Sequence, residues 1–138
     1  MKITSKLESK KGENSIILRT NNNTHSINIP AKTNGFGSSA NGGELLFLAL
    51  AACYCNDIYR ETEKNGIQVT GVDVEMTGYF GAEGEPASNI YYNTKVSANA
   101  EKEEILKLIN ITDKLAEIHN TLRNGTKVVL KNYEAVAI

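Results

Sequence analysis

One apolar segment, residues 41–67, holds both cysteines of the chain and has the periodicity of a long helix. Its apolar residues recur at helical spacing, at Leu45, Leu46, Leu48, Ala49, Ala52, Cys53, Tyr54 and Ile58. Because the first turns are apolar on almost every side, we expect the helix to be buried in the domain or against a partner subunit. A cysteine on such a helix is either a packing residue or a shielded nucleophile.

Local signals mark both ends of this helix. Asn41 and Glu44 have the spacing of a capping box, in which each side chain accepts a hydrogen bond from the backbone N–H of the other. We therefore expect Glu44 to start the helix rather than to act as a catalytic carboxylate. Polar residues return after Tyr59, and Asn65-Gly66 predicts the C-terminal end.

The rest of the chain predicts an α+β fold. Three short antiparallel strands are expected before the helix, at residues 2–8, 15–20 and 25–30. Two alternating strands joined as a hairpin are expected after it, at residues 69–80 and 90–98. A second helical region and two closing strands complete the order, at residues 100–123 with a break near 110–113, and at 126–131 and 134–138. Strands and helices do not alternate regularly, which argues against a parallel sheet.

The composition and charge of the chain exclude some classes of function. The chain has 138 residues, and we expect residues 1–138 to form a single domain. The balance of 15 basic and 16 acidic residues offers no charged surface for nucleic acid or membrane, so neither is expected as a partner. The N-terminal residues lack the apolar core of a secretion signal, and the longest apolar run, Leu45 to Cys55, has 11 residues, too few to span a membrane. We therefore expect a cytoplasmic protein with free thiols.

A glycine-rich loop precedes the helix and matches a nucleotide-binding pattern only superficially. Residues 35–40, GFGSSA, fit G-x-G-x-x-A, but that motif requires a strand running directly into the turn and an acid at the end of the next strand. The acid at the right distance, Asp57, lies within the predicted helix. We expect no nucleotide and no other cofactor.

The two cysteines point in different directions. At about 100° per residue, Cys53 and Cys55 lie about 200° apart around the helix, so they cannot form a disulfide while it stands. With no Cys or His cluster to complete a ligand set, we expect no metal site. Arg60 on the face of Cys53 favours a thiolate and Asp57 opposes it, so local sequence alone favours a buried packing thiol.

The helix sequence ELLFLALAAC, after a loop rich in Gly, Ser and Asn, resembles the osmotically inducible protein C and organic hydroperoxide resistance (OsmC/Ohr) superfamily. The family pattern is N-P-E-[EQ]-L-L, several small apolar residues, then A-[GA]-C. The resemblance covers essentially the whole chain, and residues 120–125, NTLRNG, match the stretch that ends the family's second helical region.

The resemblance implies an OsmC-like fold in an intertwined homodimer, with two active sites at the subunit interface. In catalytic members, which are peroxiredoxin-like oxidoreductases of oxidative stress, a peroxidatic cysteine attacks an organic hydroperoxide and becomes a sulfenic acid. A second cysteine then resolves it, while an Arg and a Glu keep the thiolate reactive. Cys53 stands at the peroxidatic position.

Other positions depart from the family pattern. The first carboxylate position falls on Gly43, with Gly42 in place of the proline, and Glu44 matches the non-catalytic place. The resolving position falls on Ala116, and the serine three residues later becomes His119. The activating Arg has no clear counterpart, since Lys10 and Lys11 occupy its neighbourhood and Arg19 comes later.

Three interpretations follow. In the first, Cys53 reduces or senses organic hydroperoxides, and Cys55 or, better, an external thiol resolves it. In the second, a non-catalytic homodimer binds a small hydrophobic ligand and Cys53 is structural. In the third, His119 reaches the vacated resolving site and polarises Cys53. His25 and His119 have no spacing that marks a nucleophile and base, so a Cys/His hydrolase is not expected.

Overall fold

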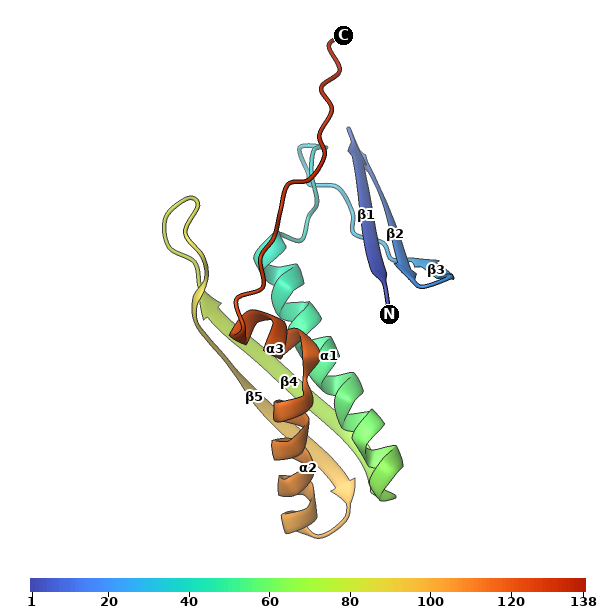
Figure 1. The fold of residues 1–138 in the computed structure, drawn as a ribbon, viewed down its shortest axis with the longest axis vertical. Coiled ribbons are helices and arrows are strands. Elements are labelled where there is room, and N and C mark those ends of the chain that lie inside the picture. Colours follow the sequence, from blue (N-terminus) through green and yellow to red (C-terminus); the bar gives the residue numbers. More distant parts are fainter. The chain divides into compact units, whose positions relative to one another are not determined.

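The computed structural model describes all residues, 1–138. The chain forms two compact units, Met1–Leu46 and Phe47–Ile138, and the long helix α1 (Gly42–Asn65) runs from the end of the first into the second. The mixed α+β composition agrees with the predicted fold class (Figure 1).

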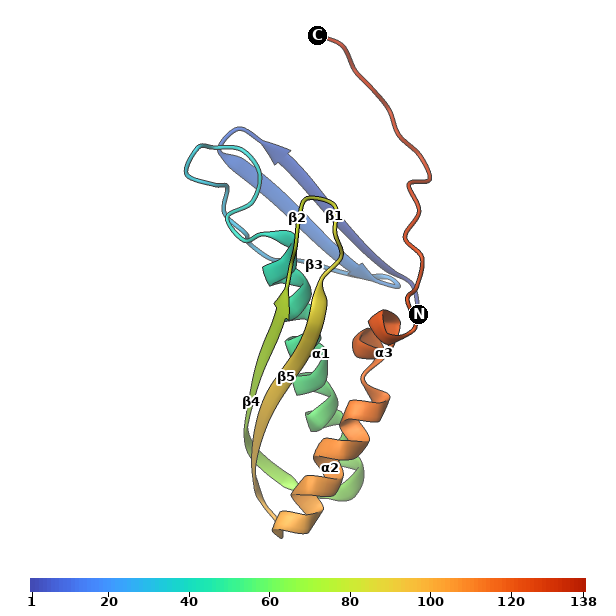
Figure 2. The ribbon, with the colours of Figure 1, turned by 90° about the vertical axis from the view of Figure 1, so that its left-hand side faces the viewer.

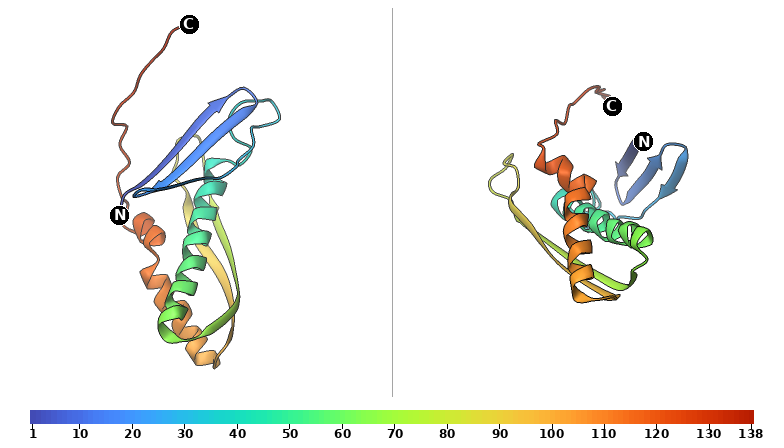
Figure 3. Two further views of the ribbon diagram at one scale, coloured as in Figure 1. Left: turned by 90° about the vertical axis from the view of Figure 1, so that its right-hand side faces the viewer. Right: turned by 60° about the horizontal axis from the view of Figure 1, so that its bottom comes forward.

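The first unit is a three-stranded antiparallel sheet in the order β1 (Ile3–Lys10), β2 (Glu13–Thr20) and β3 (Asn23–Ser26). The left panel of Figure 3 shows the long β1–β2 pair, which turns at Gly12 with a positive φ of 80°. The strand predicted at 25–30 begins earlier and ends at Ser26, where its pairing with Ile17 stops.

The start of α1 confirms the predicted capping box. The backbone N–H of Asn41 donates to Glu44 Oε2 at 2.7 Å, and that of Glu44 donates to Asn41 Oδ1 at 2.9 Å. Two donors at the helix N-terminus are thereby satisfied, so Glu44 has the structural role that its spacing predicts.

The second unit packs helices on one face of an antiparallel hairpin, β4 (Gln68–Tyr79) and β5 (Ser88–Asn99). Figure 2 shows α1 and α2 (Lys102–Leu115) over the same face of this hairpin. The core between these layers consists of Tyr54, Ile58, Leu108 and Ala116, against which Val69, Val72, Val74, Tyr92 and Val96 pack. Tyr54 also donates from its hydroxyl to the carbonyl of Ile109 at 3.1 Å, which ties α1 to α2.

The break in the second helical region lies at Ala116, not near 110–113 as predicted. Ala116 is extended, with φ −62° and ψ 101°, and separates α2 from α3 (Glu117–Arg123). Thr112 lies within α2, and its hydroxyl donates to the carbonyl of Leu108 at 2.8 Å, so this buried polar group is satisfied inside the helix. The chain therefore turns later, at a completely buried small residue.

The closing strands predicted at 126–131 and 134–138 are absent from this chain. Residues 126–138 form no secondary structure, and their apolar side chains, Val128, Val129, Leu130, Tyr133, Val136 and Ile138, are exposed. A strand needs a neighbouring strand for its backbone hydrogen bonds, and no strand of this chain pairs with these residues. Separately, none of the helices combines the length and apolarity required to cross a membrane.

Candidate functional site

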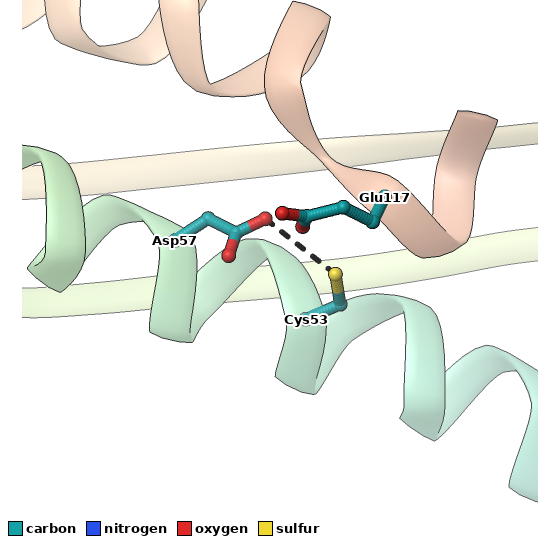
Figure 4. Close-up of side chains that lie close together, drawn as sticks. All are labelled: Cys53, Asp57 and Glu117. Atoms are coloured by element: carbon teal, nitrogen blue, oxygen red, sulfur yellow. Dashed lines mark hydrogen bonds between the residues drawn. The ribbon is translucent and has the colours of Figure 1, made fainter. Parts of the chain in front are cut away.

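Cys53 lies in the middle of α1 as a half-buried free thiol. Its Sγ lies 3.5 Å from Oδ2 of Asp57, one turn further along the same helix, and donates a hydrogen bond to it (Figure 4). The separation of four residues places both side chains on one face of α1. The nearest polar partner of the thiol is therefore a carboxylate.

Glu117 brings a second carboxylate to this thiol from another element. It is the first residue of α3, directly after the break at Ala116, and its side chain extends toward Asp57 and Cys53 (Figure 4). One ligand atom from each of Cys53, Asp57 and Glu117 falls within 4.8 Å of the others. We call these three residues the Cys53 cluster.

Arg60 brings a cation to the two carboxylates of the cluster. Its Nη1 lies 3.1 Å from Asp57 Oδ1 and 3.1 Å from Glu117 Oε1, and its Nε lies 3.5 Å from Glu61 Oε1. Asp57 is only 5% exposed, and a buried carboxylate needs such a partner. Arg60, the cation that the sequence places near the thiol, therefore forms ion pairs with carboxylates.

The surroundings raise the pKa of the Cys53 thiol above its ordinary value. Burial contributes most, and the negative charges of Asp57 and Glu117 add to it, while a hydrogen bond with the Ile118 backbone acts in the opposite direction. The pKa of Asp57 is also raised, chiefly by burial and then by Glu117, despite the opposing effect of Arg60. The thiol is therefore protonated near neutral pH, and the carboxylate beside it is more basic than an ordinary aspartate.

The donor set of the Cys53 cluster also bears on metal binding. Thiolate and carboxylate are ligands of zinc, although no metal site was expected from the sequence. Arg60 Nη1 lies 3.1 Å from Asp57 Oδ1 and 3.1 Å from Glu117 Oε1, so one oxygen of each carboxylate already has a cation partner.

Cys55 lies two residues further along α1 as a second half-buried free thiol. The helix is continuous through both cysteines, so their side chains project from nearly opposite sides. The structure does not bring Cys55 to Cys53.

His119 lies in α3 and is 6% exposed. Its ring packs 5.2 Å from that of Tyr92 and 6.1 Å from that of Tyr54, measured between centroids, and neither ring nitrogen has a hydrogen-bond partner. It forms no hydrogen bond with Cys53, so the structure offers no direct contact through which it would polarise the thiol.

Sequence reasoning named Asp57 and Arg60 but missed Glu117. A signal was available, because Glu117 directly follows Ala116, the position matched to the resolving cysteine of the family, and residues next to that position should lie near Cys53.

Sequence reasoning also missed a network of hydrogen bonds around Tyr92, for which the sequence holds no comparable signal. Tyr92 donates to Asp113 Oδ1 at 2.6 Å and Arg123 Nη2 donates to the same oxygen at 2.7 Å, from separate elements.

Residues 35–131 match the family model described as OsmC-like protein, and the chain belongs to this family. A comparison with curated proteins finds no significant match.

Solved structures support the fold assignment. An OsmC-like protein from Mycoplasma pneumoniae is 19% identical, with a TM-score of 0.60, over 90% of this chain and 87% of that one. A protein from Psychrobacter arcticus, described as a putative osmotic stress induced and detoxification response protein, is 21% identical, with a TM-score of 0.60 and 86% coverage of both chains. The organic hydroperoxide resistance protein OhrB of Bacillus subtilis is 13% identical, with a TM-score of 0.54, over 91% of this chain and 93% of that one.

The residues that the sequence comparison places at family positions can be located in the structure. Gly42 and Gly43 form the first residues of α1, and Arg19 lies in β2, where its Nε donates to Thr24 Oγ1 at 3.3 Å. Ala116, which the resemblance matches to the resolving position, is completely buried and directly precedes Glu117.

Proposed function

We propose that this OsmC-like protein is a thiol-dependent reductase of organic hydroperoxides in which Cys53 is the reacting thiol and Asp57 accepts its proton. The observation that carries the proposal is the hydrogen bond from Cys53 Sγ to Asp57 Oδ2 at 3.5 Å, and Cys53 is the residue that the sequence resemblance matches to the peroxidatic cysteine. Relatives named as organic hydroperoxide resistance proteins support the choice of substrate.

The raised thiol pKa makes proton transfer the central step. Asp57 takes the proton as the sulfur attacks the terminal oxygen of a hydroperoxide, and the O–O bond breaks. The leaving alkoxide takes the proton and departs as an alcohol, while Cys53 is oxidised to a sulfenic acid. Arg60 keeps Asp57 ionised and ready to accept the proton, through its 3.1 Å contact with the other carboxylate oxygen.

An external thiol completes the cycle. It attacks the sulfenic acid to form a mixed disulfide and water, and a second thiol releases Cys53 and carries away the disulfide. Cys55 is a poor internal candidate because the intact α1 holds the two sulfur atoms on opposite sides.

The protein is proposed to work as a homodimer, with residues 1–138 as one domain of each subunit in the cytoplasm. Every residue of β1 is exposed, including the apolar Ile3 and Leu7. Residues 126–138 add an exposed apolar stretch without a strand to pair with. Exposed apolar surface of this extent is typical of chains that associate.

The test is steady-state turnover of tert-butyl hydroperoxide with a dithiol reductant. Cys53→Ser should fall to background, whereas Cys55→Ser should keep the wild-type rate. Asp57→Asn should lose at least about tenfold, since a positioned base contributes about 10²–10⁴ in rate. Equal rates for wild type and Cys53→Ser would rule out the function, and a faster Asp57→Asn enzyme would rule out the proton transfer.

A second candidate function is a non-catalytic homodimer that binds a small hydrophobic ligand, with Cys53 as a structural thiol. The raised thiol pKa favours it, because a protonated thiol is a weak nucleophile. Here wild type and Cys53→Ser would turn over hydroperoxide equally slowly. The thiol would also resist a neutral alkylating reagent from about pH 5 to about pH 9, although an ordinary thiol, with a pKa of about 8.5, becomes reactive within that range.

A further inference from the structure

The Cys53 thiol lies beside two carboxylates that share one cation. One ligand atom from each of Cys53, Asp57 and Glu117 falls within 4.8 Å of the others. Arg60 is the cation, and its Nη1 lies 3.1 Å from one oxygen of each carboxylate. Two negative charges and one positive charge leave an excess of one negative charge next to the sulfur.

The pKa of the thiol follows the sign of this excess charge. The charges that shift it, those of Asp57 and Glu117, both raise it. A thiolate is disfavoured there because it adds a negative charge beside two carboxylates. An anionic molecule in contact with the sulfur is disfavoured for the same reason.

Glu117 is the carboxylate of the cluster that faces solvent. Its side chain is 63% exposed, whereas Asp57 is buried. It reaches the thiol from α3, while Cys53 and Asp57 both belong to α1 (Figure 4). Because the sulfur is itself half-buried, a molecule that reaches it from solvent comes close to the Glu117 carboxylate. Asp57 is the proposed proton acceptor, and Glu117 has no part in that step.

We infer that Glu117 determines by charge which external thiol reduces the oxidised Cys53, favouring a thiol with a cationic group near its sulfur and disfavouring an anionic one. The inference rests on the proposed function, because only a sulfenic acid at Cys53 needs such a partner. The sulfur of the reductant forms an S–S bond with Cys53 as the S–OH bond breaks, and the hydroxide takes a proton and leaves as water.

The charge of the attacking species explains this preference. A thiol attacks as its thiolate, so every reductant brings one negative charge toward the two carboxylates. An ammonium group near the thiolate cancels that charge, whereas a carboxylate group doubles it. Cationic thiols should therefore react fastest, neutral thiols more slowly and anionic thiols most slowly, relative to their reaction with an uncharged site.

Alkylation of the reduced full chain measures the effect of Glu117 without any peroxide. Iodoacetamide is neutral and iodoacetate is an anion of similar size, and the sulfur displaces iodide from both. Their rate ratio at Cys53, read by mass spectrometry, does not depend on the fraction of thiolate. In Glu117→Gln the preference for iodoacetamide should fall about threefold at about 10 mM ionic strength. The difference from wild type should shrink at about 1 M salt, where charges are screened within about 3 Å.

Matched variants separate charge from shape. Glu117→Asp keeps the carboxylate, so its ratio should stay closer to that of the wild type than to that of Glu117→Gln. Glu63→Gln, an exposed change on α1, should leave the ratio unchanged, and so should Glu117→Gln at Cys55, on the opposite side of the helix. An unchanged ratio at Cys53 in Glu117→Gln, or a Glu117→Asp protein that behaves like Glu117→Gln, would overturn the inference.

Turnover of tert-butyl hydroperoxide tests the reductant itself. Cysteamine, N-acetylcysteamine and 3-mercaptopropionate supply a cationic, a neutral and an anionic thiol. In Glu117→Gln, kcat/KM for 3-mercaptopropionate should rise about threefold relative to that for cysteamine at low ionic strength. Turnover with an unchanged ratio would overturn the assignment of the reductant alone, whereas wild-type protein without turnover would overturn the proposed function as well.

Discussion

The thiol of Cys53 donates a hydrogen bond to the carboxylate of Asp57, with 3.5 Å between Sγ and Oδ2 (Figure 4). Both side chains come from one face of α1, so the pair is built into a single helix. The carboxylate raises the pKa of the thiol while offering it a proton acceptor. The same contact therefore disfavours a resting thiolate and favours proton transfer during attack.

The first prediction concerns the ionisation of Cys53. Asp57→Asn removes a negative charge from the thiol, so its pKa should fall and its alkylation by iodoacetamide should begin at lower pH. The pH profile of alkylation, read by mass spectrometry at Cys53, measures this shift. Glu63→Gln, an exposed change on the same helix, is the matched control and should leave the profile in place. A profile that moves to higher pH in Asp57→Asn would contradict the prediction.

The second prediction concerns Arg60. Arg60→Gln leaves the buried carboxylate of Asp57 beside Glu117 without a cation, so the free energy of unfolding at pH 7 should fall by about 1–3 kcal/mol. We expect a smaller loss of stability than for a fully buried ion pair, because the Arg60 side chain is 41% exposed. The loss should be smaller at about pH 5 than at pH 7, because the raised pKa of Asp57 favours protonation on acidification, and protonation removes the charge that Arg60 compensates.

Urea denaturation at both pH values measures this effect. Lys64→Gln removes an exposed partner of Glu61 and should cost less than about 1 kcal/mol. Equal losses for Arg60→Gln and Lys64→Gln would show that the Arg60 bridge contributes no more than a surface pair.

The third prediction concerns the pH dependence of stability through His119. The pKa of His119 in the folded protein lies below the ordinary value of 6.5. Between these two pKa values the unfolded chain therefore binds a proton at His119 and the folded chain does not. Stability from this source is present above pH 6.5 and is lost as the pH falls toward the folded pKa, with a slope of at most about 1.4 kcal/mol per pH unit.

Denaturation of wild type and His119→Phe between about pH 7.5 and 5.5 tests this, over a window around the ordinary histidine pKa. The variant should lose stability less steeply on acidification than the wild type does. Identical slopes for wild type and His119→Phe would exclude a buried neutral imidazole.

The fourth prediction concerns a glycine of β4. A Cβ on Gly78 would lie 2.5 Å from the Phe47 ring and 3.1 Å from Ile90, so Gly78→Ala should destabilise the protein by about 1–3 kcal/mol through overpacking. Gly71→Ala, in the same strand, meets no atom within 4 Å and should change stability little. Thermal unfolding of both variants measures the difference, and equal midpoints would show that the Phe47 ring moves aside freely.

The fifth prediction concerns association. Deletion of residues 126–138 removes an exposed apolar stretch that has no partner strand in the chain, so the proposed homodimer should weaken. Light scattering after size-exclusion chromatography should give twice the chain mass for the full protein and a lower mass for the shortened one. A full-length protein that stays monomeric at high concentration would refute the homodimer.

Much of the candidate site was predictable because it belongs to one helix. The spacing of Cys53, Asp57 and Arg60 on one face follows from the helical repeat, as does the opposite direction of Cys55. The contacts that the Arg60 guanidinium makes with carboxylates could not be predicted in full. Its guanidinium also contacts Glu117, which lies 57 residues away in the sequence.

Local sequence patterns were enough to predict α1, its capping box at Asn41 and Glu44 and the β4–β5 hairpin, because these depend on hydrogen bonds and periodicity among near neighbours. The helix break at Ala116, the approach of Glu117 to Cys53 and the packing of the buried His119 ring against Tyr92 could be seen only in the folded structure. These outcomes depend on how α3 packs against α1 and β5. Packing between distant elements follows from the shape and burial of many side chains together, which local patterns do not encode.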